Sequence, residues 1–242
     1  MSAQQAITLA AHQAGQLSSF SSTMNVKMSG EVSGNMGGGM QVRTRPSLLA
    51  TADFSTIDIA GHTLPGGMQE IVTRKAIYIK MAPIARHFGK PWLEATFAQL
   101  QTGTGLNFNQ LTQQIQNNNP LVQTQMLTGA KNVRAVGTQV INGVRTTHYT
   151  GSYTAAAGLA RLPSSFRATE QRGLQALGIK TMAFNVWIDA QHQVRKIIVA
   201  EQGSLEQATV TMQVTGINQP VSVSLPPPGQ VAMIPSSALS GH

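Results

Sequence analysis

The strongest constraint on the fold of this chain is a strict alternation of polar and apolar residues near its N-terminus. In the run 23–32, Met24, Val26 and Met28 stand at every second position, and polar residues fill the positions between them. Successive side chains of a β-strand point to opposite faces of its sheet. The run therefore predicts a strand with one dry face and one wet face.

Methionine forms much of this dry face, and the next run continues it with Met36, Met40 and Val42. A methionine side chain has three rotatable bonds and a polarisable sulfur, so a face of this kind adapts to contacts of varied shape. Such adaptability suits a greasy ligand. However, apolar strand faces are more often ordinary core. The residue pattern alone leaves both interpretations open.

The alternation returns through most of the chain and is interrupted by turn residues. The predicted strands cover residues 20–32, 36–45, 48–60, 68–73, 76–81, 132–141, 144–153, 181–189, 193–202, 205–216 and 220–225. The pair Asn142-Gly143 between two of them is the preferred sequence of a type I′ hairpin turn. Glycine inside a strand marks a sharp bend or a close backbone approach, so Gly37, Gly38 and Gly39 predict strong curvature of the second strand.

Helices are predicted in three parts of the chain. Ser2 and Gln5 form a capping box, and small apolar residues at helical spacing follow it. Residues 155–161 and 164–178 form two further predicted helices. Residues 83–131 are predicted as short helices and loops that cover one side of the sheet.

Two prolines and two aromatic residues stand within this covering segment. Pro83 and Pro91 stand at plausible first positions of short helices. Phe88 and Trp92 follow them closely and would form either part of a lid or the anchor of a helix.

These elements predict a single α+β domain. We expect a strongly curved antiparallel β half-barrel of about 10–11 strands, with helices covering its concave face. No Ser/Pro/Gly spacer divides the middle of the chain, so residues 1–228 are predicted to form one domain. Three consecutive prolines end at Pro228, and residues 229–242 are predicted to form a loose tail.

The charge pattern narrows the choice of partners. Lys and Arg number 17 against 9 Asp and Glu, which gives a net charge of +8. No basic run is longer than two residues, and no aromatic platform interleaves with the cations, which argues against nucleic acid. A diffuse positive field suits anionic lipid headgroups, although Lys27, Arg43, Arg45, Arg74 and Lys75 would equally form a solvated strand face.

The sequence also limits the chemistry that the chain can perform. It contains no cysteine, which excludes disulfides and thiolate catalysis, and no apolar stretch approaches the ~20 residues of a membrane-spanning helix. Nucleotide-binding, hydrolase and metalloprotease motifs are absent. The six histidines are scattered, and His148 is best explained as a structural residue. We therefore predict no catalytic residue, no metal site and no enzymatic activity.

Several segments occur in a characteristic order. They read AIYIKM at 76–81 followed by Trp92, VINGVRTTHYTG at 140–151, FNVWID at 184–189 followed by VRKI at 194–197, and QPVSVSLPP at 219–227. In this order they resemble the strands and hairpins of the LppX/LprG lipoproteins, which belong to the LolA-like lipoprotein-carrier superfamily. The resemblance extends over nearly the whole chain, from the first helix to Pro228.

The resemblance implies an unclosed half-barrel with helices over its mouth and an apolar cavity inside. It also implies binding of acylated lipids or lipoglycans and their movement between membranes of the bacterial cell envelope, without catalysis. Members are usually tethered by a lipidated cysteine behind a signal peptide. We therefore expect an extracytoplasmic, lipid-anchored protein whose signal peptide and anchoring cysteine have been removed from this chain.

The predicted lipid site consists of apolar residues on the inward strand faces and on the covering helices. They are Met24, Val26, Met28, Met36, Met40, Val42, Phe54, Ile79, Leu111, Ile115, Leu121, Met126, Leu174, Met182, Phe184, Val186 and Met212. Helices within 83–128 and 164–177 would gate the entrance. The alternative function is an envelope sensor or protein-interaction module on the same fold, with its groove filled by its own side chains.

The expected partners are an acylated lipid or glycolipid, a membrane surface, and an envelope transporter or acceptor protein. We expect a monomer that does not bind nucleic acid. No cofactor is predicted, apart from a bound lipid or fatty acid.

Overall fold

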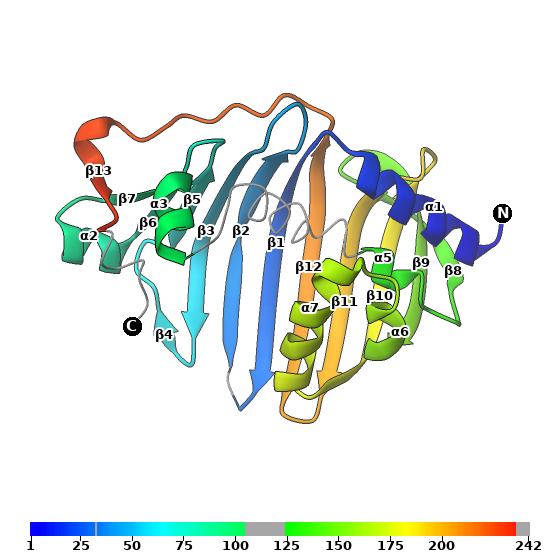
Figure 1. Cartoon of the computed structure of the whole chain (residues 1–242). Coiled ribbons are helices and arrows are strands. Elements are labelled where there is room, and N and C mark those ends of the chain that lie inside the picture. The colour runs from blue at the N-terminus through cyan, green and yellow to red at the C-terminus, as the bar shows by residue number, and fades with distance from the viewer. Residues whose placement is uncertain (32, 105–123, 236–242) are drawn as a thin grey trace.

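One large sheet with helices along one of its faces makes up the protein (Figure 1). The computed structural model describes residues 1–31, 33–104 and 124–235, and only the backbone of residues 103, 104, 165, 166 and 169. The sheet has 13 strands in the order β13-β7-β6-β5-β3-β2-β1-β12-β11-β10-β9-β8, and β4 pairs with β3 beside this path. The sheet is curved and not closed into a barrel, so the predicted α+β half-barrel is confirmed.

The bounds of the elements follow the predicted pattern closely. The strands are β1 (Ser19–Gly30), β2 (Gly34–Arg43), β3 (Leu49–Ile59), β4 (His62–Thr63), β5 (Met68–Val72), β6 (Ala76–Met81), β7 (Trp92–Thr96), β8 (Arg134–Ile141), β9 (Val144–Thr154), β10 (Ile179–Asp189), β11 (Val194–Gly203), β12 (Glu206–Ile217) and β13 (Val231–Met233). The helices are α1 (Ala3–Gln16), α2 (Ala82–Phe88), α3 (Phe97–Thr104), α5 (Thr124–Leu127), α6 (Ala155–Leu159), α7 (Ser164–Ala176) and the short 3-10 helix η1 (Pro228–Gln230).

The first and the last long strands meet in the middle of the sheet. β1 pairs antiparallel with β12 from Phe20 opposite Ile217 to Gly30 opposite Glu206, and its other edge pairs with β2. Strands from the two ends of the sequence therefore join the two halves of the sheet. The β8–β9 turn has the expected geometry, with positive φ angles of 48° at Asn142 and 77° at Gly143.

Several short elements differ from the prediction. Pro91 leads into strand β7 rather than a helix, so part of the segment 83–131 belongs to the sheet. The structure contains no strand at 220–225. The chain there instead runs along one edge of the molecule (Figure 1), and residues Val231–Met233 pair parallel with β7. These three residues lie within the predicted tail, and they pair because the far edge of β7 offers backbone groups that the returning chain can bind.

The helices lie over the two ends of the sheet. α1 has the predicted capping box, in which the Ser2 hydroxyl accepts from the Gln5 amide and the Gln5 side chain accepts from the Ser2 amide. Its buried residues are mainly alanines, which allow close packing. α5, α6 and α7 lie over β9 to β12, whereas α2 and α3 lie at the β6–β7 end (Figure 1). We call the face that carries α5–α7 the inner face.

A polar and aromatic cluster stabilises the outer face. The Trp187 ring stacks on His148 with ring centroids 4.3 Å apart and donates from its indole nitrogen to Gln139 at 2.8 Å. His148 Nε2 is hydrogen-bonded to Asn185 Oδ1 at 2.9 Å. His148 thus has the structural role that the sequence predicts.

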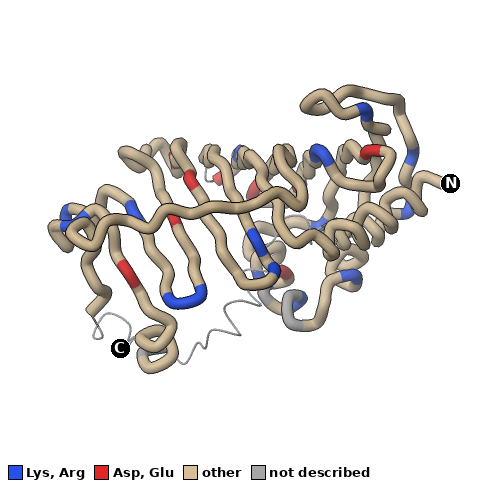
Figure 2. The backbone as a smooth tube through the Cα atoms, turned by 90° about the horizontal axis from the view of Figure 1, so that it is seen from above, with Lys and Arg blue, Asp and Glu red and all other residues tan. Residues whose placement is uncertain are grey.

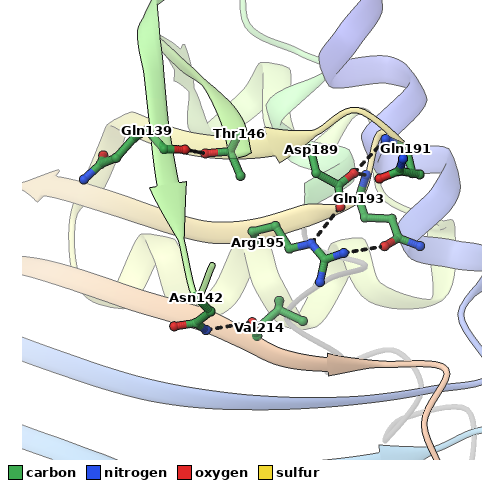
Figure 3. Close-up of polar contacts among 8 residues, drawn as sticks. All are labelled: Gln139, Asn142, Thr146, Asp189, Gln191, Gln193, Arg195 and Val214. Carbon is green, nitrogen blue, oxygen red and sulfur yellow. Dashed lines mark hydrogen bonds and ion pairs between the residues drawn. The ribbon is translucent and has the colours of Figure 1, made fainter. Parts of the chain in front are cut away.

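The turn between β10 and β11 is organised by a buried carboxylate (Figure 3). Asp189 accepts from the backbone amides of Gln191 and Gln193, each at 2.9 Å, and from Arg195 Nε at 2.7 Å. At the tip of the neighbouring hairpin, Asn142 donates to the Val214 carbonyl of β12 at 3.4 Å. The Asn142 bond ties the tip of the β8–β9 hairpin back to the middle of the sheet.

No helix in the described part of the chain is long and apolar enough to cross a membrane.

Candidate lipid-binding face

The strand register places the predicted lining residues on a single face of the sheet. In one cross-strand row, Val186 lies opposite Ile197, Ile197 opposite Met212, and Met212 opposite Met24. Directly opposite residues of neighbouring strands project to the same side. Because α5 and α7 cover this side, the row lies on the inner face.

Two further rows carry more of the predicted strand residues. The second row runs from Phe184 through Val199, Val210 and Val26 to Met36. A further row extends toward the other end of the sheet from Met40 through Ala52 and Glu70 to Ile79. The predicted strand residues of the site that share this face are Met24, Val26, Met28, Met36, Met40, Val42, Phe54, Ile79, Met182, Phe184, Val186 and Met212.

Helices contribute two more predicted residues. Met126 of α5 is 3% exposed and Leu174 of α7 is 5% exposed, and both belong to the core that packs on the inner face. Leu111, Ile115 and Leu121 lie outside the described residues. Whether any of these residues contacts a lipid remains a prediction.

The half of the inner face that lies under α5–α7 is densely filled. Phe184 and Val186 of β10 are fully buried at 0% exposure. The described residues leave a cavity of about 60 Å³ there, between α5, α7 and β9–β12. Ligand pockets usually measure about 300–1,000 Å³. A cavity of this size does not hold a hydrocarbon chain without movement of the side chains or helices around it.

The other half of the inner face is more open. Met24, Val26, Met28, Met36 and Met40 are all only half-buried, and we call these five residues the methionine face. The described helices lie to either side of β1 and β2 and do not cover them (Figure 1). A contiguous apolar patch that is left partly exposed typically marks a binding surface.

A close backbone contact shapes this open half. The pairing of β2 with β3 shifts register between Gly37 and Gly39. A Cβ atom on Gly38 would lie 2.1 Å from the Asp53 carbonyl oxygen, whereas one on Gly39 would meet its nearest atom at 3.5 Å. Gly38 thus lets β2 approach β3 closely at the bulge. Of the three glycines, only Gly38 makes so close a contact with a neighbouring backbone.

The inner face also carries carboxylates that were not among the predicted site residues. Glu201 of β11 lies opposite Met182 and lines the 60 Å³ cavity together with Glu170 of α7 and Tyr153 of β9. Burial, and secondly the nearby Glu170 carboxylate, raise the pKa of Glu201 to about 7. Burial also raises the pKa of Glu170 and of Glu70.

A sequence signal for two of these residues did exist. Glu201 continues the alternation of Ile197 and Val199, and Glu70 stands between Met68 and Val72 at the same parity. A carboxylate at an apolar position of a strand predicts a buried charge. The sequence does not predict that Glu170 lies near Glu201, because this depends on the packing of α7 over β11.

The remaining charges are dispersed. Lys and Arg are spread over the length of the molecule rather than gathered into one stripe (Figure 2). Within the described residues, no three His, Asp or Glu side chains come together as metal ligands do.

Comparison with known proteins supports the fold. No family model matches the chain. The chain is 28% identical over 130 residues to an uncharacterized 31.2 kDa protein of Streptomyces griseus, a match that covers 51% of this chain and 42% of that protein. The structure of the present chain superposes on LprF from Mycobacterium bovis with a TM-score of 0.54 and 14% identity. The superposition covers 93% of this chain and 96% of LprF. The lipoprotein LppX from Mycobacterium tuberculosis gives a TM-score of 0.49 and 18% identity, with 92% and 98% covered.

The similarity to LprF shows a shared fold over nearly the full length of both chains. The fold that the resemblance in the sequence implies, an unclosed half-barrel with helices over one face, is therefore confirmed. The curated Streptomyces protein is matched over less than half of its length.

Proposed function

We propose that this protein binds acylated lipids on the inner face of its half-barrel, as a non-enzymatic carrier in the bacterial cell envelope. The observation that supports this most directly is the methionine face. It is continuous across β1 and β2, faces the same side as the core, and is left half-exposed among the described residues.

The dimensions of this face suit a hydrocarbon chain. At about 3.4 Å per residue, Met24 and Met28 lie roughly 14 Å apart along β1, and the paired strands β12, β1 and β2 are spaced by about 4.8 Å. Each buried methylene contributes about 0.8 kcal/mol. Ten methylenes would contribute about 8 kcal/mol, which corresponds to a micromolar Kd before the costs of association are subtracted.

The acyl chain would lie on the methionine face rather than in the enclosed cavity. The cavity of about 60 Å³ is too small for it. Methionine side chains change rotamers easily, so the face can adjust to chains of different shape. The envelope location, anchoring and transport role belong to this proposal and follow from the resemblance of the sequence to the LppX/LprG lipoproteins.

The dense packing of the inner face under α5–α7 favours a second function. The dense core beneath α5–α7 is what an envelope sensor or protein-interaction module would show, since such a module needs no internal space. In that case the methionine face would contact a protein and not a lipid.

Native mass spectrometry and organic extraction of the purified protein distinguish the two. Co-purifying lipid, or binding of added phospholipid or fatty acid by the stripped protein, supports the carrier. A stripped protein that rejects both supports the interaction module.

A pair of variants locates the site. Met36→Lys places a charge within the methionine face and is expected to weaken palmitate binding at least tenfold. Thr23→Lys adds the same charge to the outer face of the neighbouring strand, where Thr23 is exposed, and should leave binding unchanged. Equal binding by both variants and the parent protein would place the lipid elsewhere.

A further inference from the structure

Three polar groups surround the small cavity in the densely packed half. Glu201 approaches it from β11, Glu170 from α7 above the sheet, and Tyr153 from β9. The other lining residues are apolar, mainly methionine and valine. The cavity of about 60 Å³ holds a few water-sized groups at most.

None of the three polar groups has a hydrogen-bond partner among the described residues. Tyr153 is 7% exposed as a residue, and its side chain lines the cavity. Most buried polar groups in proteins are paired, and each unpaired one needs an explanation. The tyrosine thus gives a reason, independent of the two carboxylates, to expect a polar guest in the cavity.

The described surroundings contain no cation that would neutralise the carboxylates. No Lys or Arg lines the cavity. The two arginines of α7 are hydrogen-bonded to backbone carbonyls. Arg167 donates to the carbonyls of Leu159 and Leu162, and Arg172 donates to the carbonyl of Ala168. The raised pKa of Glu201 reflects this lack of compensation, because burial and a neighbouring carboxylate both disfavour its ionised form.

The cavity borders the methionine face directly. Val210 and Met212 of β12 line the cavity, and across the sheet they lie opposite Val26 and Met24 of β1. A ligand whose chain lies on the methionine face could therefore place its polar end in the cavity without leaving the inner face.

From this arrangement we infer that the cavity is the headgroup site for an amphiphile with a protonated primary amine. An ammonium group carries three N–H donors and no acceptor, and it is close to a water molecule in size. It would donate to Glu170, Glu201 and the Tyr153 hydroxyl oxygen, and its charge would offset that of the carboxylates. An anionic headgroup would be repelled. This inference rests on the proposed function and specifies its ligand class.

Three probes with the same sixteen-carbon chain test the inference: hexadecylamine, hexadecanol and palmitic acid. Each is titrated into the stripped protein at pH 8 by calorimetry. We expect the amine to bind at least tenfold more tightly than the other two. The net charge of +8 favours palmitate in general, so a preference for the amine must arise locally.

Variants assign the preference to the cavity. Glu201→Gln and Glu170→Gln keep the shape of the side chain and are each expected to remove most of the preference for the amine. Glu31→Gln removes the same charge from an exposed position at the end of β1 and serves as the control, with the preference retained. Thermal unfolding of each variant verifies that it folds.

The results separate this inference from the proposed function. If all three probes bind equally, or if the amine preference survives Glu201→Gln, the headgroup site is wrong while lipid binding stands. If no probe binds, the proposed function fails and the headgroup site fails with it.

Discussion

The two halves of the inner face have the same strand pattern but differ in how they are covered. Under α5–α7, apolar residues such as Phe184 and Val186 are completely buried. On β1 and β2, residues at the same kind of position, such as Met24 and Met36, are only half-buried. Alternation therefore decides which face a residue lies on, and the covering elements decide whether that face becomes core or remains available to a ligand.

Truncation of one large side chain in each half gives the largest expected contrast. Phe184→Ala should lower the free energy of unfolding by about 3–5 kcal/mol, because it leaves a cavity in a packed core. Met36→Ala should lower it by about 1 kcal/mol, since its side chain already contacts solvent. Urea denaturation measures both. Equal losses would show that the methionine face is ordinary core.

Glycine substitutions test the geometry of the open half. Gly38→Ala should lower the free energy of unfolding by about 1–3 kcal/mol, because its Cβ would overlap the backbone of Asp53. Gly39→Ala is the matched control, since its Cβ meets only an ordinary contact, and should change stability by less than about 0.5 kcal/mol. The same urea titrations check the pair, and a Gly38→Ala variant as stable as Gly39→Ala would contradict the close approach.

The dense half should respond to pH. The pKa of Glu201 is raised from 4.5 to about 7 in the folded protein. Between these values the folded state holds a proton that the unfolded chain has released, so the stabilisation is complete below about pH 4.5 and is lost as pH rises through about 7. Glu201→Gln should remove most of this dependence and should be more stable than the parent at pH 8, on the order of 1–2 kcal/mol.

Denaturation curves from pH 4.5 to 8 provide the measurement. Glu31→Gln should keep the dependence of the parent protein. A parent protein whose stability rises over this range would contradict the sign of the shift.

The smallest effect is expected at the boundary between the halves. Ser22 of β1 is 3% exposed, and its hydroxyl has no hydrogen-bond partner in the described part of the chain. Ser22→Ala removes the unpaired hydroxyl, so it should leave stability unchanged or raise it by up to about 1 kcal/mol. A clear loss of thermal stability would reveal a polar contact for this hydroxyl.

Several features could be predicted from single segments of sequence. The alternation of Met24, Val26 and Met28 predicted their common face, and Ser2 with Gln5 predicted the first helix cap. Strand β7 was missed because Pro91 resembles a helix start. The short strand β13 has only three residues, and it forms because the edge of β7 is available.

The sequence by itself determined which residues of each long strand share a face, and it determined the β8–β9 turn and the first helix. These features depend on side-chain direction and backbone preferences within a few residues. The tertiary structure decided the pairing of β1 with β12, the meeting of Glu170 with Glu201, and the difference between a filled and an open half. Each of these requires segments that are distant in sequence to come together. Their contacts depend on the curvature of the whole sheet and on the positions at which the helices pack. No local sequence pattern determines these two features.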